Sequence, residues 1–583
     1  MQVAGDIFTG TVFFVTGTAN ATSSQNHHHH YHRPFVHHFA YMFNTLSGVK
    51  LSPDPDDDPR AAIFSVASLL LLLFLFLLLL RRTFRYLRMK SFLSTLPSVS
   101  PLRYPFLPFL GNLLDFTLAG LTPWDLMVRW HRVHGPIYRF ILLGRDCVSV
   151  SSPAMLRQVL QTNVAGVKKD VDFAYKPFLS ILGTGIVTSE GKEWLRQRLS
   201  VGKVLRHEIL DDIPHITLRM VRRLCLTLDE AAASQSPVEI SELLRHLTLQ
   251  VISNAFLGLD PDESDGTFAI MYLPIVDEGN RRVWAPHRAY MVWTPAFWRH
   301  LAAVRRLNGY VSSLIMRRWE ERRTSSIEGR RRKDVLDHVL NAYKDAYGED
   351  RPLPISVLRQ VRDEMKTFML AGHETSAAMM TWVMYELIKI NGSEMVHTIT
   401  KEAEKVFTMG KDWCGGELDE AIAALPDRET LGKLCFSEGC LKEALRKYSV
   451  VPTVTRQIIT GTAVGCHMLP PGTTVMIGIQ SIHHDPTIWK DPESYQPSRF
   501  CNPSPPPKPY TFIPFIDGPR NCLGQYLALL ESKMVLSLLF QRYEFGVPGE
   551  EENRSREGGD PRHLFMVPII PKDDVNLTVR RRF

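Results

Sequence analysis

The segment from Phe515 to Gly524 constrains this chain more than any other part of its sequence. It reads FIDGPRNCLG, so that a lone cysteine, Cys522, lies between two glycines and directly before an apolar stretch. The eight cysteines of the chain include no C-x-x-C pair, whereas zinc and iron–sulfur sites need several Cys or His ligands at short spacing. Cys522 can therefore act as a metal ligand only where another group supplies the remaining ligands.

A porphyrin is such a group, because its four nitrogens leave the protein to supply an axial thiolate. The neighbours of Cys522 suit this hypothesis. Gly518 and Gly524 allow a tight turn and a close approach to a flat ring, Arg520 can pair with a haem propionate, and Phe515 can cover the sulfur. The following residues, 523–540, predict a helix whose N-terminus lowers the pKa of the thiol. For Cys522 taken alone, a buried structural cysteine remains the alternative.

The pattern F-x-x-G-x-R-x-C-x-G resembles the haem-binding loop of the cytochrome P450 family, the haem-thiolate monooxygenases. Other family patterns follow in order. Glu443 and Arg446, 79 and 76 residues before Cys522, form E-x-x-R and share a face of a predicted helix. The segment Pro497 to Phe500 is similar to the P-x-R-F of the family. The resemblance implies that Arg499 joins Glu443 and Arg446 in a buried structural triad.

The sequence AGHETS, residues 371–376, interrupts a helical pattern from about 355 to 390. A glycine within a helix costs about 1 kcal/mol relative to alanine, so Gly372 needs a reason. The resemblance implies that Gly372 leaves space for dioxygen, that Thr375 bonds back to the Ala371 carbonyl, and that Glu374 and Thr375 are the catalytic pair that relays protons. A glycine packed against a neighbouring element, with Glu374 solvated, is the alternative.

Three further residues resemble the positions that hold the haem propionates in this family. Trp194 and Arg198 form W-x-x-x-R and lie on one helical face, and Arg456 lies in a predicted short strand. For each arginine alone, a solvated surface position is the alternative. The resemblance implies haem b as cofactor, with its iron bound by Cys522.

The stretch 61–80 carries no charge and consists largely of leucine. At 1.5 Å per residue it is long enough to span a bilayer, although a buried core helix is the alternative. Acidic residues precede it and basic residues follow it, which places the basic side in the cytoplasm. We therefore expect a single-pass membrane protein, with the endoplasmic reticulum as its location and a plastid membrane also open. The expected divisions are a disordered extension (1–60), a transmembrane helix (61–80), a basic, proline-rich linker (81–101) and one catalytic domain (102–583).

Helical patterning dominates residues 102–583, with strand-like segments at 137–141, 475–479 and 575–579. The predicted fold class is therefore mainly α with small β-sheets, the cytochrome P450 fold. The net charge of +7 is modest for 583 residues, which disfavours nucleic-acid binding.

The resemblance implies a haem-dependent monooxygenase that inserts one atom of O2 into an apolar substrate, of the lipid, sterol, terpenoid or carotenoid class. Electrons would come from NADPH through a flavoprotein reductase, or through cytochrome b5 or a ferredoxin in an organelle. Two alternatives remain: a haem-thiolate isomerase or dehydratase that needs no O2, and a non-catalytic haem-binding membrane protein. The Glu374–Thr375 pair favours the monooxygenase. A basic docking face for the reductase has as its candidates Lys192, Arg196, Lys442 and Lys447.

Overall fold

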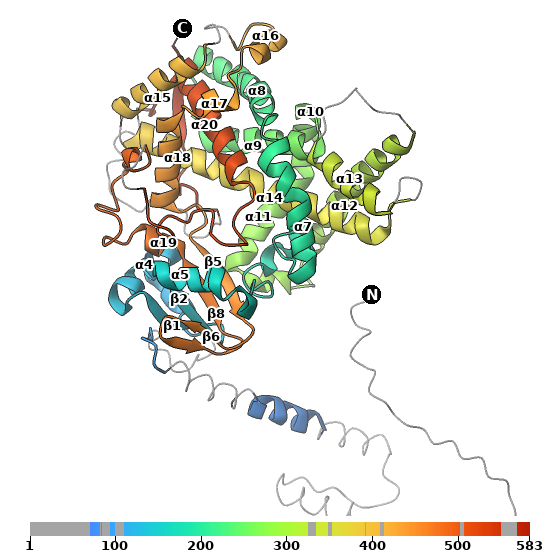
Figure 1. Ribbon diagram of the computed structural model, residues 1–583, viewed down its shortest axis with the longest axis vertical. Helices are drawn as coiled ribbons and strands as arrows, with labels where there is room; N and C mark the ends of the chain where they lie inside the picture. Colours follow the sequence, from blue (N-terminus) through green and yellow to red (C-terminus); the bar gives the residue numbers. More distant parts are fainter. Residues whose placement is uncertain are drawn as a thin grey trace, which may run out of the picture. The chain divides into compact units, whose positions relative to one another are not determined.

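The computed structural model describes residues 70–81, 83, 94–99, 110–324, 334–347, 352–390, 392–408, 413–501, 506–549 and 568–582 (Figure 1). The chain divides into two compact units, Met1–Tyr86 and Leu87–Phe583. The division falls within the expected linker, 81–101. Every predicted site residue belongs to the second unit.

In the first unit, residues 70–81 are helical, and the side chains from Leu70 to Leu80 are between 44% and 63% exposed. Residues 61–69, the first part of the expected transmembrane helix, lie outside the described residues, as does the extension 1–60. Of the residues that are described, none forms a helix long and apolar enough to cross a bilayer. The expected span is therefore not confirmed.

The second unit is mainly helical. Its α-helices are α3 (Leu113–Leu118), α4 (Pro123–His134), α5 (Pro153–Arg157), α6 (Leu179–Leu182), α7 (Gly191–Lys203), α8 (Ile213–Ser234), α9 (Ile240–Leu257), α10 (Pro261–Glu263), α11 (Ile270–Trp284), α12 (Pro295–Thr324), α13 (Val335–Tyr347), α14 (Ile355–Met384), α15 (Ser393–Val406), α16 (Leu418–Ala423), α17 (Arg428–Leu431), α18 (Cys435–Tyr448), α19 (Ile479–His483) and α20 (Gln525–Arg542).

The long helix α14 lies at the centre of the helical body (Figure 1). It packs most extensively against α9 and also contacts α6, α12, α18 and α20. A π-helical turn, η7 (Tyr385–Ile390), continues it, so that the predicted helical run 355–390 is confirmed. Twenty of its residues are buried, which include polar ones such as Asp363, His373 and Glu374. Because buried polar groups need partners, the surroundings of α14 determine what these side chains can do.

The strands form three small sheets, and the five-stranded sheet lies at one end of the unit beside α4, α5 and α19 (Figure 1). Its order is β1-β2-β8-β5-β3; the other sheets are β4-β10-β9 and β6-β7. The predicted strands 137–141, 475–479 and 575–579 correspond to β1, β8 and β10. The strands are β1 (Ile137–Leu142), β2 (Arg145–Val150), β3 (Val167–Lys168), β4 (Val238–Glu239), β5 (Thr453–Ile458), β6 (Thr462–Val464), β7 (His467–Leu469), β8 (Thr474–Gly478), β9 (Tyr543–Gly546) and β10 (Asn576–Arg581).

The predicted fold class, mainly α with small sheets, is confirmed. The register of β3 with β5 matters for the site, because Lys168 pairs with Gln457 in an antiparallel ladder. Lys169 follows Lys168 and Arg456 precedes Gln457, so that the antiparallel pairing brings Lys169 and Arg456 opposite each other.

Candidate functional site

The loop that carries Cys522 is closed by its own backbone. The Cys522 N–H donates to the Phe515 carbonyl at 2.9 Å. Gly518 has φ +79°, and a Cβ there would lie 2.3 Å from the carbonyl oxygen of Leu160, so that this turn requires glycine. Gly524 differs from the expectation. Its φ of −84° suits any residue, so that the turn itself does not require glycine here, although a Cβ at this position would lie 4.0 Å from the Cys522 sulfur.

The Cys522 side chain is exposed to a water-sized probe, although protein surrounds it closely enough that desolvation raises the pKa of the thiol. Both properties hold together where a side chain faces an internal space. Backbone N–H groups of Gly524 and Gln525, and the charges of Arg198 and Lys169, act in the opposite direction. The N–H groups at the N-terminus of α20 thus lower this pKa as predicted, but burial has the larger effect and the net pKa of the free thiol is raised.

Helix α7 runs beside this loop and brings Trp194 and Arg198 to it. Arg198 donates through Nη1 to the Asn521 carbonyl at 2.9 Å and through Nη2 to the Asn521 side chain. The Trp194 ring lies near two guanidinium groups, with its centroid 4.0 Å from Cζ of Arg520 and 5.8 Å from Cζ of Arg198. The structure thus brings Arg520 of the cysteine loop together with both residues of the W-x-x-x-R motif.

A fourth predicted residue, Arg456, is 5% exposed and donates to the neighbouring Thr455 carbonyl at 2.8 Å. No carboxylate of the described residues is within ion-pair distance of it. Burial lowers the pKa of Arg456, while Tyr175 and Glu190 oppose the shift. A buried guanidinium in such surroundings is unfavourable unless an anion accompanies it.

Lys169 completes a cluster of four cations with Arg198, Arg456 and Arg520. Burial and the charges of Arg456 and Arg520 lower the pKa of Lys169 to about 7, against the opposing charge of Glu190. Burial also lowers the pKa of Arg520 to about 10, although Glu190 opposes the shift, and Arg456 and Arg198 lower it further. Glu190 accepts from the Lys169 backbone N–H at 2.8 Å and forms an ion pair with Arg520.

Four cations thus face a single carboxylate, and their mutual repulsion shows that this cluster is suited to an additional anion. The accessible sulfur of Cys522 lies beside the cation cluster, because Arg520 belongs to the same loop and Arg198 donates to Asn521 in that loop. A ligand that offers a metal to the thiolate and carboxylates to the cations meets both requirements. The residues present therefore fit haem, with its iron and its two propionates.

In the middle of α14, two residues face away from the protein core. Ala371 is exposed and Thr375 is partly exposed, although the helix on either side is largely buried. Thr375 Oγ1 donates to the Ala371 carbonyl at 2.7 Å, which is the predicted back-bond. The helix that carries these accessible positions also contacts α20, which begins just after Cys522.

Gly372 has a different role from the one the resemblance implied. A Cβ at this position would lie 2.6 Å from Cδ1 of Ile252 on α9. The space beside the glycine is therefore filled by Ile252 and is not open to dioxygen. The alternative of a mid-helix glycine packed against a neighbouring element describes Gly372 correctly.

Glu374 is held on the α9 side of the helix. Arg245 donates to its Oε1 through Nη2 at 2.7 Å and Nε at 2.9 Å, and Nε2 of His373 lies 3.1 Å from the same oxygen. Burial alone would raise the pKa of Glu374, but His373 and Arg245 outweigh it and hold the pKa at about 2. Arg245 in turn reaches Asp277 at 3.0 Å, which is 45% exposed. The carboxylate of Glu374 is therefore not solvated, and its hydrogen bonds go to Arg245, whereas the hydroxyl of Thr375 donates to the Ala371 carbonyl.

The three members of the predicted triad are joined by ion pairs. Arg446 donates to Glu443 through Nη2 at 2.7 Å and Nε at 2.9 Å, and both side chains are fully buried. Nε of Arg499 lies 3.3 Å from Oε1 of Glu443, the oxygen that also accepts from Nη2 of Arg446. Arg499 also donates to the Lys490 and Asp491 carbonyls, so that the triad ties α18 to the segment before the Cys522 loop.

Comparison with known proteins agrees with this geometry. The sequence model of the cytochrome P450 family matches residues 101–572. The chain belongs to the cytochrome P450 family. It is a haem-iron monooxygenase of this family, as the relatives below also indicate.

Several curated cytochromes P450 are similar to this chain over most of its length. Cytochrome P450 4c21 of Blattella germanica is 28% identical, over 72% of this chain and 82% of its own length. Putative cytochrome P450 132 of Mycobacterium bovis is 29% identical, over 76% and 90%. The protein LUTEIN DEFICIENT 5, chloroplastic, of Arabidopsis thaliana is 25% identical, over 76% and 75%.

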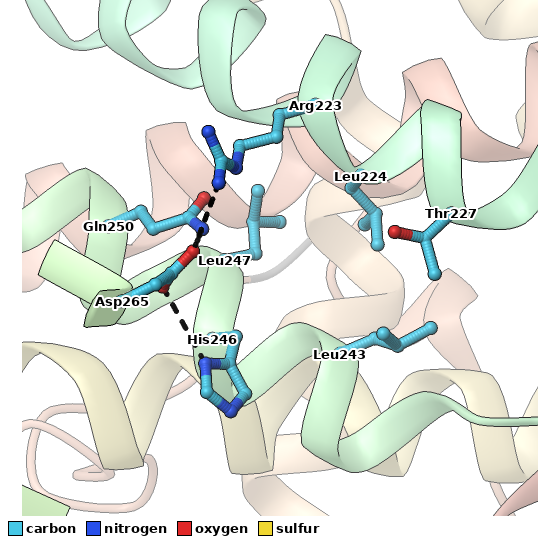
Figure 2. Close-up of a pocket in the computed structure, with 8 residues that line it drawn as sticks. All are labelled: Arg223, Leu224, Thr227, Leu243, His246, Leu247, Gln250 and Asp265. Atoms are coloured by element: carbon cyan, nitrogen blue, oxygen red, sulfur yellow. Dashed lines mark hydrogen bonds and ion pairs between the residues drawn. The ribbon is translucent and has the colours of Figure 1, made fainter. Parts of the chain in front are cut away.

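A separate small pocket of this cytochrome P450 lies between α8 and α9 (Figure 2). It has a volume of about 250 Å³. Asp265 is one of the residues that line the pocket. It accepts a hydrogen bond from Gln250 at 2.7 Å and lies 3.6 Å from Arg223 and 3.7 Å from His246. None of the predicted site residues lines it.

Sequence reasoning missed four residues of the P450 site: Lys169, Glu190, Arg245 and Ile252. None belongs to a motif. No sequence signal pointed to Lys169, which lies 287 positions before Arg456; only the strand register brings the two together.

Proposed function

We propose that this cytochrome P450 binds haem b through Cys522 and oxidises an apolar substrate with electrons that come from NADPH through a flavoprotein reductase. The observation that carries the proposal is the combination of an accessible sulfur at Cys522 with the adjacent cluster of Lys169, Arg198, Arg456 and Arg520. A thiolate ligand beside an anion site suits haem and few other cofactors.

Bound haem supplies the activation of O2 and the transfer of one oxygen atom, the other leaving as water. The chain holds and shields the group. Cys522 would bind the haem iron, and the four cations would neutralise the propionates. The Trp194 ring lies against Arg520 and near Arg198 and would limit their movement. The triad of Glu443, Arg446 and Arg499 is a structural element that fixes the segment leading into the loop.

We assign proton delivery to Thr375 and Glu374, with Thr375 as the residue nearer to the haem site and Glu374 as the residue farther from it. The Thr375 hydroxyl lies at the accessible side of α14, where it can receive and pass on a proton. Glu374 is ionised and bound to Arg245, so that it must leave this ion pair before it can transfer a proton toward Thr375. Asp277, half exposed at the far side of Arg245, offers a connection to solvent.

The substrate class is inferred from the surroundings of α14. The core around this helix consists mainly of apolar side chains, and the accessible face at Ala371 and Thr375 contributes a methyl group and a hydroxyl already engaged with the backbone. An apolar molecule of the lipid, sterol, terpenoid or carotenoid class suits such a space better than a charged one.

Membrane association is part of the proposal. The uncharged stretch 61–80 supports it, and so does an exposed group of large side chains at the start of α12 and before it: Tyr290 (56%), Val292 (51%), Trp293 (74%) and Trp298 (56%). Trp and Tyr favour the membrane–water interface. Replacing Trp293 and Trp298 with serine should weaken binding of the protein to phospholipid vesicles, and unchanged binding would count against this contact.

The test of the proposed function is a pair of measurements on the purified full chain. The reduced, carbon monoxide-treated protein should show the red-shifted Soret band of a thiolate-bound haem, and the Cys522→Ser variant should lose it. Incubated with a purified flavoprotein NADPH reductase and a panel of lipids and terpenoids, the wild type should consume O2 and NADPH in step with product. Product formed without O2 would favour an isomerase or dehydratase instead.

The Thr375→Ala variant tests proton delivery. Its O2 consumption should be diverted toward peroxide, while its carbon monoxide spectrum stays that of the wild type. Unchanged coupling of O2 consumption to product would remove Thr375 from the proton path.

A further inference from the structure

We propose that Cys225 and Cys414 are a redox-active pair, which hydrogen peroxide converts from two thiols into a reversible disulfide that fixes the segment 413–417 to α8. Both cysteines are free thiols in the structure. Neither belongs to the Cys522 loop or to the cation cluster, so that this inference does not depend on the proposed function.

The two cysteines lie 189 positions apart in the sequence but meet beside α8. The Cys414 thiol donates to the Arg222 carbonyl of α8, with Sγ at 3.9 Å from the oxygen. Cys225 follows Arg222 by three positions, so that its side chain lies on the same side of the helix. The Cys225 thiol in turn donates a hydrogen bond to the sulfur of Cys414. The two sulfurs are therefore in contact, as formation of a disulfide requires.

The segment 413–417 is anchored to its surroundings on both sides of Cys414. Arg222 donates through Nη1 to the Glu417 carbonyl at 3.3 Å and through Nη2 to the Gly416 carbonyl. Trp413 is 4% exposed and belongs to the hydrophobic core. These anchors hold the sulfur of Cys414 beside Cys225.

The surroundings of the pair make the two thiols unequal. The hydrogen bond from Cys225 lowers the pKa of Cys414, and Arg542 and Arg222 act in the same direction. Burial and the charge of Asp229 oppose them. The same hydrogen bond, together with burial, raises the pKa of Cys225. Because the thiolate is the nucleophile, Cys414 attacks the oxidant, and Cys225 keeps its proton until the second step.

A small oxidant meets Cys414 before Cys225. Cys414 is 9% exposed, whereas Cys225 is 0% exposed. The two residues after Cys414 are exposed glycines, Gly415 and Gly416, so that no bulky side chain covers the sulfur from this direction. Hydrogen peroxide is only slightly larger than water and suits so narrow an approach.

Two steps form the disulfide. The Cys414 thiolate attacks one oxygen of hydrogen peroxide: an S–O bond forms, the O–O bond breaks, and the leaving hydroxide takes up the proton that Cys414 had released. The sulfur has then passed two electrons to the peroxide and is a sulfenic acid. The sulfur of Cys225 attacks it: the S–S bond forms, the S–O bond breaks, and hydroxide leaves with the Cys225 proton as water. A dithiol reverses the reaction by thiol–disulfide exchange and is itself oxidised to a disulfide.

The first experiment treats the haem-loaded full chain with a small molar excess of hydrogen peroxide and maps its peptides by mass spectrometry without reduction. A cross-linked peptide that contains Cys225 and Cys414 should appear, lighter by two hydrogen atoms than the separate peptides, and dithiothreitol should remove it. Absence of this peptide from the oxidised wild type would overturn the proposal, whatever the variants do.

A second pair in the same chain is the matched comparison. The Cys501 thiol donates to the Cys435 carbonyl at 3.7 Å, and both residues are more exposed than Cys225 and Cys414. Burial and the charge of Glu402 raise the pKa of Cys501 to about 11. This pair should therefore form a disulfide more slowly. A disulfide between Cys435 and Cys501 that forms first would show that exposure decides the reaction, and the proposal would be wrong.

Dimedone, which reacts with sulfenic acids, tests the order of the two steps. In the Cys225→Ser variant the sulfenic acid has no neighbouring thiol, so that peroxide followed by dimedone should label Cys414. In the Cys414→Ser variant the same treatment should leave Cys225 unlabelled. Label on Cys225, or on neither cysteine, would overturn the proposal.

Thermal unfolding tests whether the disulfide fixes the segment. The oxidised wild type should unfold at a midpoint at least about 2 °C above that of the reduced protein, and peroxide should not raise the midpoint of Cys414→Ser. An equal midpoint for the oxidised and reduced wild type would contradict the proposal. The carbon monoxide Soret band is recorded before oxidation as a separate readout: its absence would refute the proposed function and leave the cysteine pair unaffected.

Discussion

Replacing Arg245 with methionine should destabilise the folded protein by about 3 kcal/mol at neutral pH. Methionine keeps most of the length of the side chain and removes the charge. Glu374, whose side chain is 7% exposed, would then remain buried without its guanidinium partner. Asp277 and Glu242, the other carboxylates near Arg245, are 45% and 59% exposed and remain solvated.

Two independent routes give the magnitude. The pKa of Glu374 lies at about 2 in the folded protein and at 4.5 without its surroundings, and about 1.4 kcal/mol per pKa unit converts this gap to roughly 3 kcal/mol. Removal of one partner from a buried ion pair costs about 3–5 kcal/mol in other proteins. His373, 3.1 Å from Glu374, can compensate in part, so that the lower end of the range is expected.

The pH dependence follows from the direction of the shift. A carboxyl group with a depressed pKa stabilises the fold above its ordinary pKa of 4.5, and this contribution is lost as the pH falls toward 2. In the Arg245→Met variant, burial raises the pKa of Glu374, which then takes up a proton at higher pH and escapes the penalty. The difference in stability between the two proteins should therefore shrink between pH 7 and pH 5.

The assay is urea unfolding of the detergent-solubilised full chain at both pH values, for wild type, Arg245→Met, Glu374→Gln and the double variant. A coupling energy of about 2–3 kcal/mol at pH 7 is expected. Asp277→Asn is the control and should cost less than about 1 kcal/mol, since that carboxylate is half exposed. A coupling below about 0.5 kcal/mol, or an equal loss at pH 7 and pH 5, would refute the reasoning.

Three further predictions concern stability and haem retention. Glu443→Gln should cost about 3–5 kcal/mol in urea unfolding, because it leaves two guanidinium groups without their buried carboxylate; a loss below 1 kcal/mol would contradict this. Gly372→Ala should lower the free energy of unfolding by about 1–3 kcal/mol through overpacking. Adding Ile252→Val in the same chain should recover part of this loss; an unrecovered loss would show that the alanine methyl group does not clash with Ile252. Lys169→Met should raise the midpoint of thermal unfolding of the haem-free protein, because it removes repulsion between Lys169 and the neighbouring arginines. The same variant should speed transfer of haem to apomyoglobin. The matched control, Lys168→Met, should change neither the midpoint nor the transfer rate.

The sequence predicted those parts of the structure that depend on local spacing. The helices that carry Trp194 and Glu443, and the strands β1, β8 and β10, follow from periodicity within single segments. The contact between Glu443 and Arg446 follows from their separation of three residues on one helix. The loop that closes between Phe515 and Cys522 depends on a glycine at positive φ, which the pattern also contains.

Contacts between segments could not be predicted in this way. Lys169 reaches the cation cluster because β3 and β5 pair in one register, and a shift by one residue would turn it to the other face. The pKa of Cys522 depends on how deeply the loop is buried, which no local pattern states. A helix end lowers a thiol pKa, but desolvation acts in the opposite direction and is the larger effect here.

The largest differences between prediction and structure come from one element, α9, which carries no motif. Its residues Ile252 and Arg245, seven positions apart on one face, contact Gly372 and Glu374 respectively. The hydroxyl of Thr248, on the same helix, donates to the His373 carbonyl at 3.1 Å. Two residues that the family pattern assigns to oxygen chemistry, Gly372 and Glu374, are therefore covered by α9.

The two residues expected to share proton delivery consequently lie on different sides of α14. Ala371 and Thr375 are four positions apart and form the accessible side, whereas His373, at the centre of AGHETS, faces α9 and Glu374 flanks it. A helix turns by about 100° per residue, since 3.6 residues complete a turn, so that adjacent residues cannot present side chains to the same point. Glu374 can serve Thr375 only by rotating away from Arg245. The ion pair that stabilises the fold therefore also opposes proton transfer, and the coupling energy between Arg245 and Glu374 in the double-variant cycle gives the strength of the interaction that holds this carboxylate.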